Sequence, residues 1–74
     1  MSRELLKDIR LYKKMTQEQF AEWLGVSKIT IALIESGHRN VSDTVISKLA
    51  HKFDVTDDDF IEFRERKSNL RDFF

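Results

Sequence analysis

The feature that most constrains the fold is a glycine that is followed almost at once by a serine able to start a helix. Gly25 closes a segment with apolar residues at helical spacing, and Val26 and Ser27 alone separate it from the next such segment. A glycine here supplies the left-handed backbone that ends a helix at no steric cost. Ser27 is suited to cap the following helix. So short a turn predicts two helices that cross steeply.

Composition agrees with helices joined by short turns. The chain has 74 residues, no proline and two glycines, which favours helical segments and leaves room for one domain with one small core. It has no cysteine, so neither a disulfide nor a thiolate metal site is expected. His38 and His51 are 13 residues apart with no carboxylate pattern around them, and we therefore expect no metal and no cofactor.

Capping residues and apolar periodicity predict five helices. Ser2 is placed to cap the first, Thr16 and Gln19 form a capping box at the second, and Thr56 is expected to cap an acidic fifth helix. The expected helices run from about Arg3 to Lys13, from Thr16 to Gly25, from Ser27 to Gly37, from Ser42 to Phe53 and from Asp57 to Arg66.

The expected core consists of apolar residues that recur on one face of each helix. These are Leu6, Ile9, Phe20, Ala21, Leu24, Ile31, Ile34, Val45, Ile46, Leu49, Ala50, Phe53 and Phe60, with help from Ile61 or Phe63. The pattern predicts a compact all-α domain of five helices over residues 1–67, followed by a tail over residues 68–74.

Charge favours one half of the chain as a phosphate-facing surface. The formal net charge is zero, which by itself argues little for nucleic acid. Residues 1–40 hold seven basic and five acidic side chains, a net charge of +2, whereas residues 41–74 hold six and eight, a net charge of −2. The N-terminal half is therefore the better candidate for an anionic partner.

Membrane, export and catalytic functions find no support in the sequence. The apolar runs are a few residues long, too short to span a bilayer, and the charged N-terminus does not look like a signal peptide, so we expect a cytoplasmic protein. No spacing indicates a nucleophile with its base, and no glycine-rich loop follows a strand, so we expect no enzyme.

The residues around the turn resemble the lambda-repressor/Cro-like family, also called XRE, of helix-turn-helix DNA-binding domains. The resemblance covers about Leu6 to Ile61 and implies a transcriptional regulator, of the repressor type, from a bacterium, phage or mobile element. It rests on the run from Thr16 to Glu22, on Leu24-Gly25-Val26-Ser27, on Ile31, on Ile34-Glu35-Ser36-Gly37, on Arg39-Asn40, on Lys48-Leu49-Ala50 and on Val55-Thr56.

The resemblance also implies roles for individual residues. Gln17 would donate to a DNA phosphate from a helix N-terminus. Arg10 and Glu35 match a family pair that forms a partly buried ion pair between the first and third helices, which a buried carboxylate requires in any case. The other implied DNA contacts lie at the start of the third helix, on its groove-facing side and just after it, and they are Ser27, Lys28, Ile29, Ala32, Leu33, Arg39 and Asn40.

Four departures from the family pattern shape the expectations. Lys14 stands where the family usually has glycine, which predicts a strained turn after the first helix. Val41 replaces a frequent proline. Trp23 occupies a position that is normally polar, and packing against the core or tail is its expected role. The groove-facing side lacks the usual arginine, glutamine or asparagine base readers, and Lys28 is its one strong donor.

Two functions therefore stay open at this point. The first is a repressor that binds double-stranded DNA at a palindromic operator as a homodimer. The second is a helix-turn-helix domain that binds a protein, such as an anti-repressor or regulatory partner, through the apolar side of its third helix. A surplus of apolar residues near the C-terminus predicts a dimer contact, and these residues are Ile61, Phe63, Leu70, Phe73 and Phe74.

Overall fold

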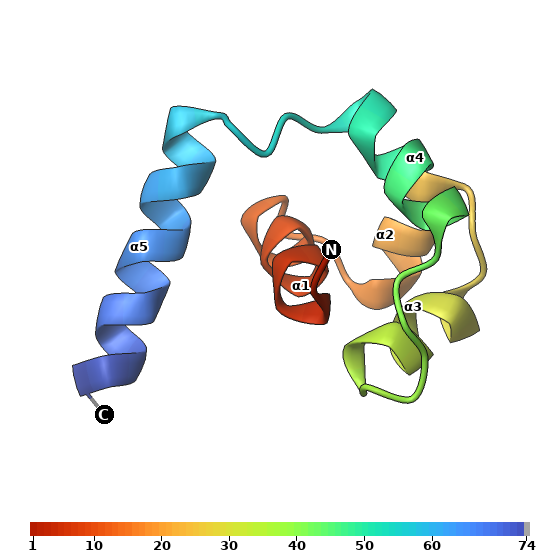
Figure 1. Ribbon diagram of the computed structural model, residues 1–74, viewed down its shortest axis with the longest axis horizontal. Helices are drawn as coiled ribbons and strands as arrows, with labels where there is room; N and C mark the ends of the chain where they lie inside the picture. Colours follow the sequence, from red (N-terminus) through yellow and green to blue (C-terminus); the bar gives the residue numbers. More distant parts are fainter. Residues whose placement is uncertain (74) are drawn as a thin grey trace.

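The computed structural model describes the backbone of residues 1–73 and the side chains of residues 1–68. All regular secondary structure in this described part is helical. The helices are α1 (Arg3–Tyr12), α2 (Gln17–Leu24), α3 (Lys28–Glu35), α4 (Asp43–Lys52) and α5 (Asp58–Phe73). Figure 1 shows α1 in the middle, with α2, α3 and α4 on one side of it and α5 on the other.

Local capping explains where the first four helices begin. Ser2, Thr16, Ser27 and Ser42 each have an extended backbone, and each side-chain oxygen accepts a hydrogen bond from the backbone N–H three residues later. Each bond satisfies one of the N–H groups that a helix N-terminus leaves unpaired, which is typically worth about 1 kcal/mol. The caps therefore fix the chain's entry into each helix independently of the core.

The core lies where α1 to α4 meet and is closed by one residue of α5. Its fully buried side chains are Leu6, Ile9, Phe20, Ala21, Leu24, Ile31, Ile34, Val45, Leu49 and Phe60. Each of these was predicted from helical spacing. Burial of this apolar set is the main force that brings the five short helices together.

An aromatic cluster attaches α5 to the rest of the domain. Tyr12 of α1 lies with its ring centroid 5.3 Å from Phe60 and 5.4 Å from Phe63. Phe53 packs edge-on to Phe60 at 5.0 Å. Edge-to-face aromatic contacts at such distances add to the area that they bury. Phe63 thus contributes to the core, whereas Ile61 is 40% exposed.

The burial of α4 and the capping of α5 differ from the sequence-based prediction. Ala50 is exposed, and Ile46 and Phe53 are only partly buried, because α4 turns a narrower face to the core than expected. Thr56 does not cap α5: its N–H and hydroxyl both donate to Asp54, and Asp57 instead accepts from the N–H of Phe60.

The hydrogen bonds from Thr56 have an electrostatic consequence. They hold the pKa of the Asp54 carboxyl below its ordinary value, mainly through the hydroxyl and then through the backbone N–H. Because Thr56 is engaged in this turn, the carboxylate of Asp57 caps α5 instead.

The helix α5 also continues to Phe73, well past the predicted end at Arg66. The expected boundary between residues 67 and 68 therefore falls inside this helix.

Candidate nucleic-acid interface

The turn between α2 and α3 has the predicted geometry. Gly25 adopts a left-handed conformation with φ of 82°, and its N–H donates to the carbonyl oxygen of Ala21 at 2.8 Å. Thr16 and Gln19 form both halves of a capping box at the start of α2. The N-termini of α2 and α3 are therefore both fixed by local hydrogen bonds. The remaining N–H groups in the first turn of each helix have no partner within that helix, and they point outward from its N-terminal end.

An ion pair joins α1 to the end of α3, between the two residues that the family resemblance implied. Arg10 donates from Nε to one oxygen of Glu35 at 2.8 Å and from Nη2 to the other at 2.9 Å. The side chains of Arg10 and Glu35 are 13% and 5% exposed. A bidentate pair with this little solvent contact fixes the position of one helix relative to the other.

Two further partners of this pair were not evident from the sequence. Arg10 Nη1 donates to the carbonyl oxygen of Met15 at 3.0 Å, and Gln17 Nε2 donates to Glu35 Oε1 at 3.2 Å. Lys14, in the turn between α1 and α2, has a positive φ of 57°. A lysine rarely adopts this conformation, so the turn is strained, as the replacement of glycine predicted. The network thus holds Gln17, the expected phosphate donor at the start of α2, against the end of α3.

The outward side of α3 carries one cation and three apolar side chains. Lys28 is exposed, Ile29 is 69% exposed, and Ala32 and Leu33 are half-buried. The hydroxyl of Ser27, in contrast, is occupied by the N–H and hydroxyl of Thr30. An exposed apolar strip next to a lysine is suited to a groove wall lined with methyl groups or to an apolar protein surface.

The turn after α3 places Arg39 and Asn40 at the surface. Gly37 has a φ of 84°, and the N–H groups of His38 and Arg39 both donate to the carbonyl oxygen of Leu33. Arg39 Nη1 lies 3.4 Å from the hydroxyl of Thr30, which holds the guanidinium beside α3. The predicted cationic and polar groups therefore flank the outward side of α3.

Lysines of α4 stabilise the C-terminus of α2, a feature that the sequence analysis missed. Lys48 donates to the carbonyl oxygen of Gly25 at 2.9 Å, and Lys52 donates to that of Trp23 at 2.7 Å. Trp23 packs on Phe20, and the ammonium of Lys13 lies 4.7 Å from its ring centroid. The spacing of four residues between the two lysines was the available signal, since it places both on one face of a helix. Trp23 thus packs against the core, in its expected role.

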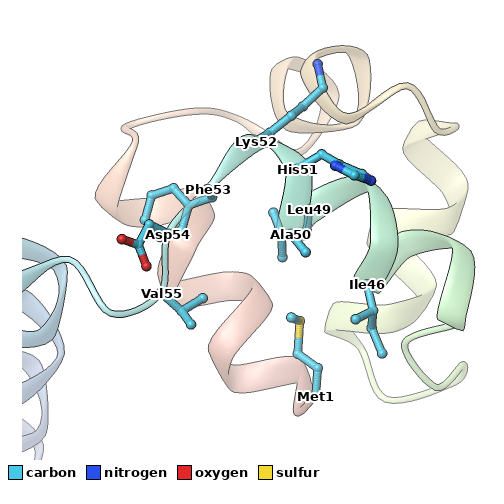
Figure 2. A pocket seen from close by; sticks show the side chains of 9 residues that line it. All are labelled: Met1, Ile46, Leu49, Ala50, His51, Lys52, Phe53, Asp54 and Val55. Atoms are coloured by element: carbon cyan, nitrogen blue, oxygen red, sulfur yellow. The ribbon is translucent and has the colours of Figure 1, made fainter.

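A second apolar surface lies far from α3 in the sequence. Figure 2 shows a hollow of about 470 Å³ that is bordered by Met1, the C-terminal half of α4 and the segment after it. Met1 and Val55 are 45% and 40% exposed there. The predicted dimer residue Ile61 is also exposed, whereas the side chains of Leu70, Phe73 and Phe74 lie outside the described residues.

Within the part of the chain that the structure describes, no group of three or more histidine or acidic side chains is arranged to hold a metal ion. Nor does any described helix have the length and apolarity needed to cross a membrane.

The geometry agrees with a comparison against protein families. A family model described as "Helix-turn-helix" matches residues 6–60, which include α2, the Gly25 turn and α3. The chain belongs to the helix-turn-helix family. The described residues form five helices and no strand, which is the lambda-repressor-like form of the helix-turn-helix fold. Domains of this kind belong to DNA-binding transcription regulators.

Three curated proteins show what this helix-turn-helix domain is similar to. An uncharacterized HTH-type transcriptional regulator from Archaeoglobus fulgidus is 34% identical over 65 residues, covering 88% of this chain and 92% of that protein. The HTH-type transcriptional regulator AnsR from Bacillus subtilis is 33% identical over 67 residues, covering 90% of this chain and 58% of AnsR.

The third relative is much longer. A propionyl-CoA carboxylase regulator from Cereibacter sphaeroides is 42% identical over 50 residues, or 68% of this chain, but these span 11% of that protein. The matched segment thus spans 58% of AnsR and 11% of the carboxylase regulator, so this chain corresponds to only part of these two relatives. No solved structure gave a significant match to the chain.

Proposed function

We propose that this chain is a sequence-specific, DNA-binding repressor of transcription that binds a short palindromic operator as a homodimer in the cytoplasm. The observation that carries the proposal is the joint placement of α2 and α3 by the Gly25 turn and the Arg10–Glu35 pair. This arrangement lets α3 enter a major groove while the start of α2 approaches the backbone. The chain acts by binding and not by catalysis.

Each expected contact has a physical role in this docking. Lys28, at the start of α3, reaches a guanine edge or a phosphate. Ile29, Ala32 and Leu33 offer apolar surface to thymine methyl groups. The groups that flank α3 neutralise or bind phosphates, and they are Gln17, the N-terminus of α3 at Ser27, Arg39 and Asn40.

A selection from random-sequence duplexes with the purified chain tests the class of function. The expected result is enrichment of one palindromic motif. Lys28→Ala should then weaken binding to that motif by about 1–3 kcal/mol, and Leu33→Ala should cost less and relax the preference at one A·T position. Unchanged operator binding by the Lys28→Ala, Leu33→Ala double variant would contradict the docking.

The apolar side of α3 supports a second candidate, a protein-binding module such as an anti-repressor. Ile29 is the most exposed of the large apolar side chains in the described residues, and the net charge of the chain is zero. This candidate predicts no enrichment in the DNA selection. It also predicts loss of a protein partner on Ile29→Asp, with Lys28→Ala causing little change.

Homodimerisation through α5 and the tail is the remaining part of the proposal. A monomer offers few base contacts, and two linked half-sites raise the affinity. Sedimentation of the full chain should show a dimer that is lost on Phe73→Ser with Phe74→Ser. A version ending at Ser68 is the matched truncation, because it keeps Lys67, which pairs with Asp8. A full chain that stays monomeric at high micromolar concentration rejects the dimer.

A further inference from the structure

The first residue of α1 lies against the turn that follows α3. A Cβ atom added at Gly37 would stand 1.8 Å from Nη1 of Arg3 and 3.1 Å from its Cζ. The guanidinium therefore occupies the space that any side chain at position 37 would need. Gly37 also has a φ of 84°, so the turn requires glycine for its backbone and leaves the space that Arg3 fills.

This position groups Arg3 with residues already expected to contact phosphates. A hollow of about 380 Å³ is bordered by residues 1–4, just before and at the start of α1, and by Gly37, Arg39, Asn40 and Val41. Arg3, at the start of α1, and Arg39, just after α3, thus line the same hollow. Nothing in the spacing of the sequence connects them, because 36 positions separate their numbers.

The charge around Arg3 leaves its guanidinium available to an anion. Its nearest carboxylate is that of Glu4, whose oxygen lies 3.5 Å from Nε, and both side chains are more than half exposed. A strong guanidinium–carboxylate hydrogen bond is about 2.7–2.9 Å long, and exposed pairs contribute little. A guanidinium presents parallel N–H donors that match a phosphate, so a second phosphate ligand beside Arg39 is chemically well suited to this place.

We infer that Arg3 contacts a phosphate of the DNA backbone at the end of α3, in a position that Gly37 keeps open. This inference rests on the proposed DNA-binding function and extends its contact surface to α1. The competing structural role is that Arg3 only stabilises the C-terminal end of α3, where a helix dipole favours a cation. The two roles differ in their response to salt.

The test measures DNA affinity against salt concentration for the wild type, Arg3→Ala, Arg3→Lys and the control Arg66→Ala. The probes are a mixed-sequence duplex and an operator obtained by random-site selection. Arg66 is 75% exposed on α5 and also loses one positive charge, so it reports the general effect of charge. Thermal melts of the same variants report the structural role.

Arg3→Ala should weaken binding roughly tenfold at fixed salt, since a hydrogen bond to a charged group is lost. The loss should be equal on both duplexes, because phosphate contacts carry no base information. The slope of log affinity against log salt should become shallower by about 0.9, the value for one phosphate. Arg3→Lys should keep the slope, and Arg66→Ala should keep both slope and affinity.

A lower melting temperature for Arg3→Ala with an unchanged salt slope would overturn the inference in favour of the structural role. An equal change in slope for Arg66→Ala would overturn it in favour of general charge. Failure of the wild type to bind either duplex would instead overturn the proposed function itself. If the wild type binds DNA and Arg3→Ala has the same slope of log affinity against log salt, only the inferred contact of Arg3 is overturned.

Discussion

One ion pair joins α1 to α3 and a second group of ion pairs joins α1 to α5, and the two differ in their exposure to solvent. On the α3 side, Arg10 and Glu35 are both largely buried. On the α5 side, Asp8 is 7% exposed, but its partners Arg64 and Lys67 are 42% and 29% exposed. The first pair has a buried cation and a buried anion, whereas the second has a buried anion that faces two partly solvated cations.

The difference teaches where the domain is rigid and where it is held mainly by apolar contacts. A buried charge depends on its partner, because removal of one leaves the other without water or compensation. Arg64 and Lys67, which face Asp8, remain partly in contact with water. Their ion pairs therefore contribute less to stability than the Arg10–Glu35 pair does. The aromatic cluster of Tyr12, Phe60 and Phe63 therefore provides most of the attachment of α5. At α3, a buried ion pair adds to the core contacts of Ile31 and Ile34.

The largest expected effect tests the α3 side. Arg10→Met should lower the free energy of unfolding by about 3 kcal/mol, since Glu35 would stay buried without its guanidinium. The matched variant Arg64→Met should cost about 1 kcal/mol or less, since Asp8 keeps Lys67. Denaturant melts measure both, and equal losses would remove the distinction between the two systems.

The α5 side has a smaller expected effect with a pH signature. Burial raises the pKa of Asp8, but hydrogen bonds and charge from Lys67 and Arg64 outweigh it, so the pKa lies below its ordinary value of 3.8. A carboxyl whose pKa is lower in the folded state stabilises the fold above the unfolded pKa. That contribution is lost as the pH falls through the folded pKa.

Asp8→Asn should therefore lower the free energy of unfolding by about 1–2 kcal/mol at neutral pH and flatten its decline below about pH 4. Glu62→Gln is the control, because its pair with Arg66 is exposed and should change stability by less than about 0.5 kcal/mol. Denaturant melts from neutral to acid pH measure both. An Asp8→Asn variant with the wild-type acid dependence would show that this pair does not stabilise the fold.

The smallest expected effect on stability concerns Gln17, which shares Glu35 with Arg10. Gln17→Ala removes a 3.2 Å hydrogen bond while Thr16 keeps the cap, so the loss should be about 0.5 kcal/mol or less. Because the proposed contact of Gln17 is with a phosphate, binding to all DNA sequences should weaken alike. A loss confined to one operator sequence would assign Gln17 to a base instead.

Local signals explain which parts of the site the sequence predicted. Caps and glycine turns depend on residues within one helical turn, and the Thr16 and Ser27 caps and the Gly25 turn were predicted and found. The mispredicted cap of α5 lies where two neighbouring residues could each serve as the cap. Asp54 uses Thr56, so Asp57 caps α5, and only the path of the chain after α4 decides between them.

Contacts between distant segments set the limit of prediction from one sequence. The Arg10–Glu35 pair was expected through family resemblance, but Gln17 joining it, and the guanidinium of Arg3 over Gly37, depend on the angle between helices. Side-chain reach alone allows many partners for a long polar residue, and packing of the core selects one of them.

The sequence by itself determined the number of helices, the starts of the first four, the turn between α2 and α3 and the ten buried core residues within a larger predicted set, because periodicity and capping act over a few residues. The tertiary structure alone decided which helix face each charged side chain meets and how firmly α3 and α5 are held to α1. The physical reason is burial: the strength of an ion pair depends on its exposure to water, and exposure exists only once the helices have packed.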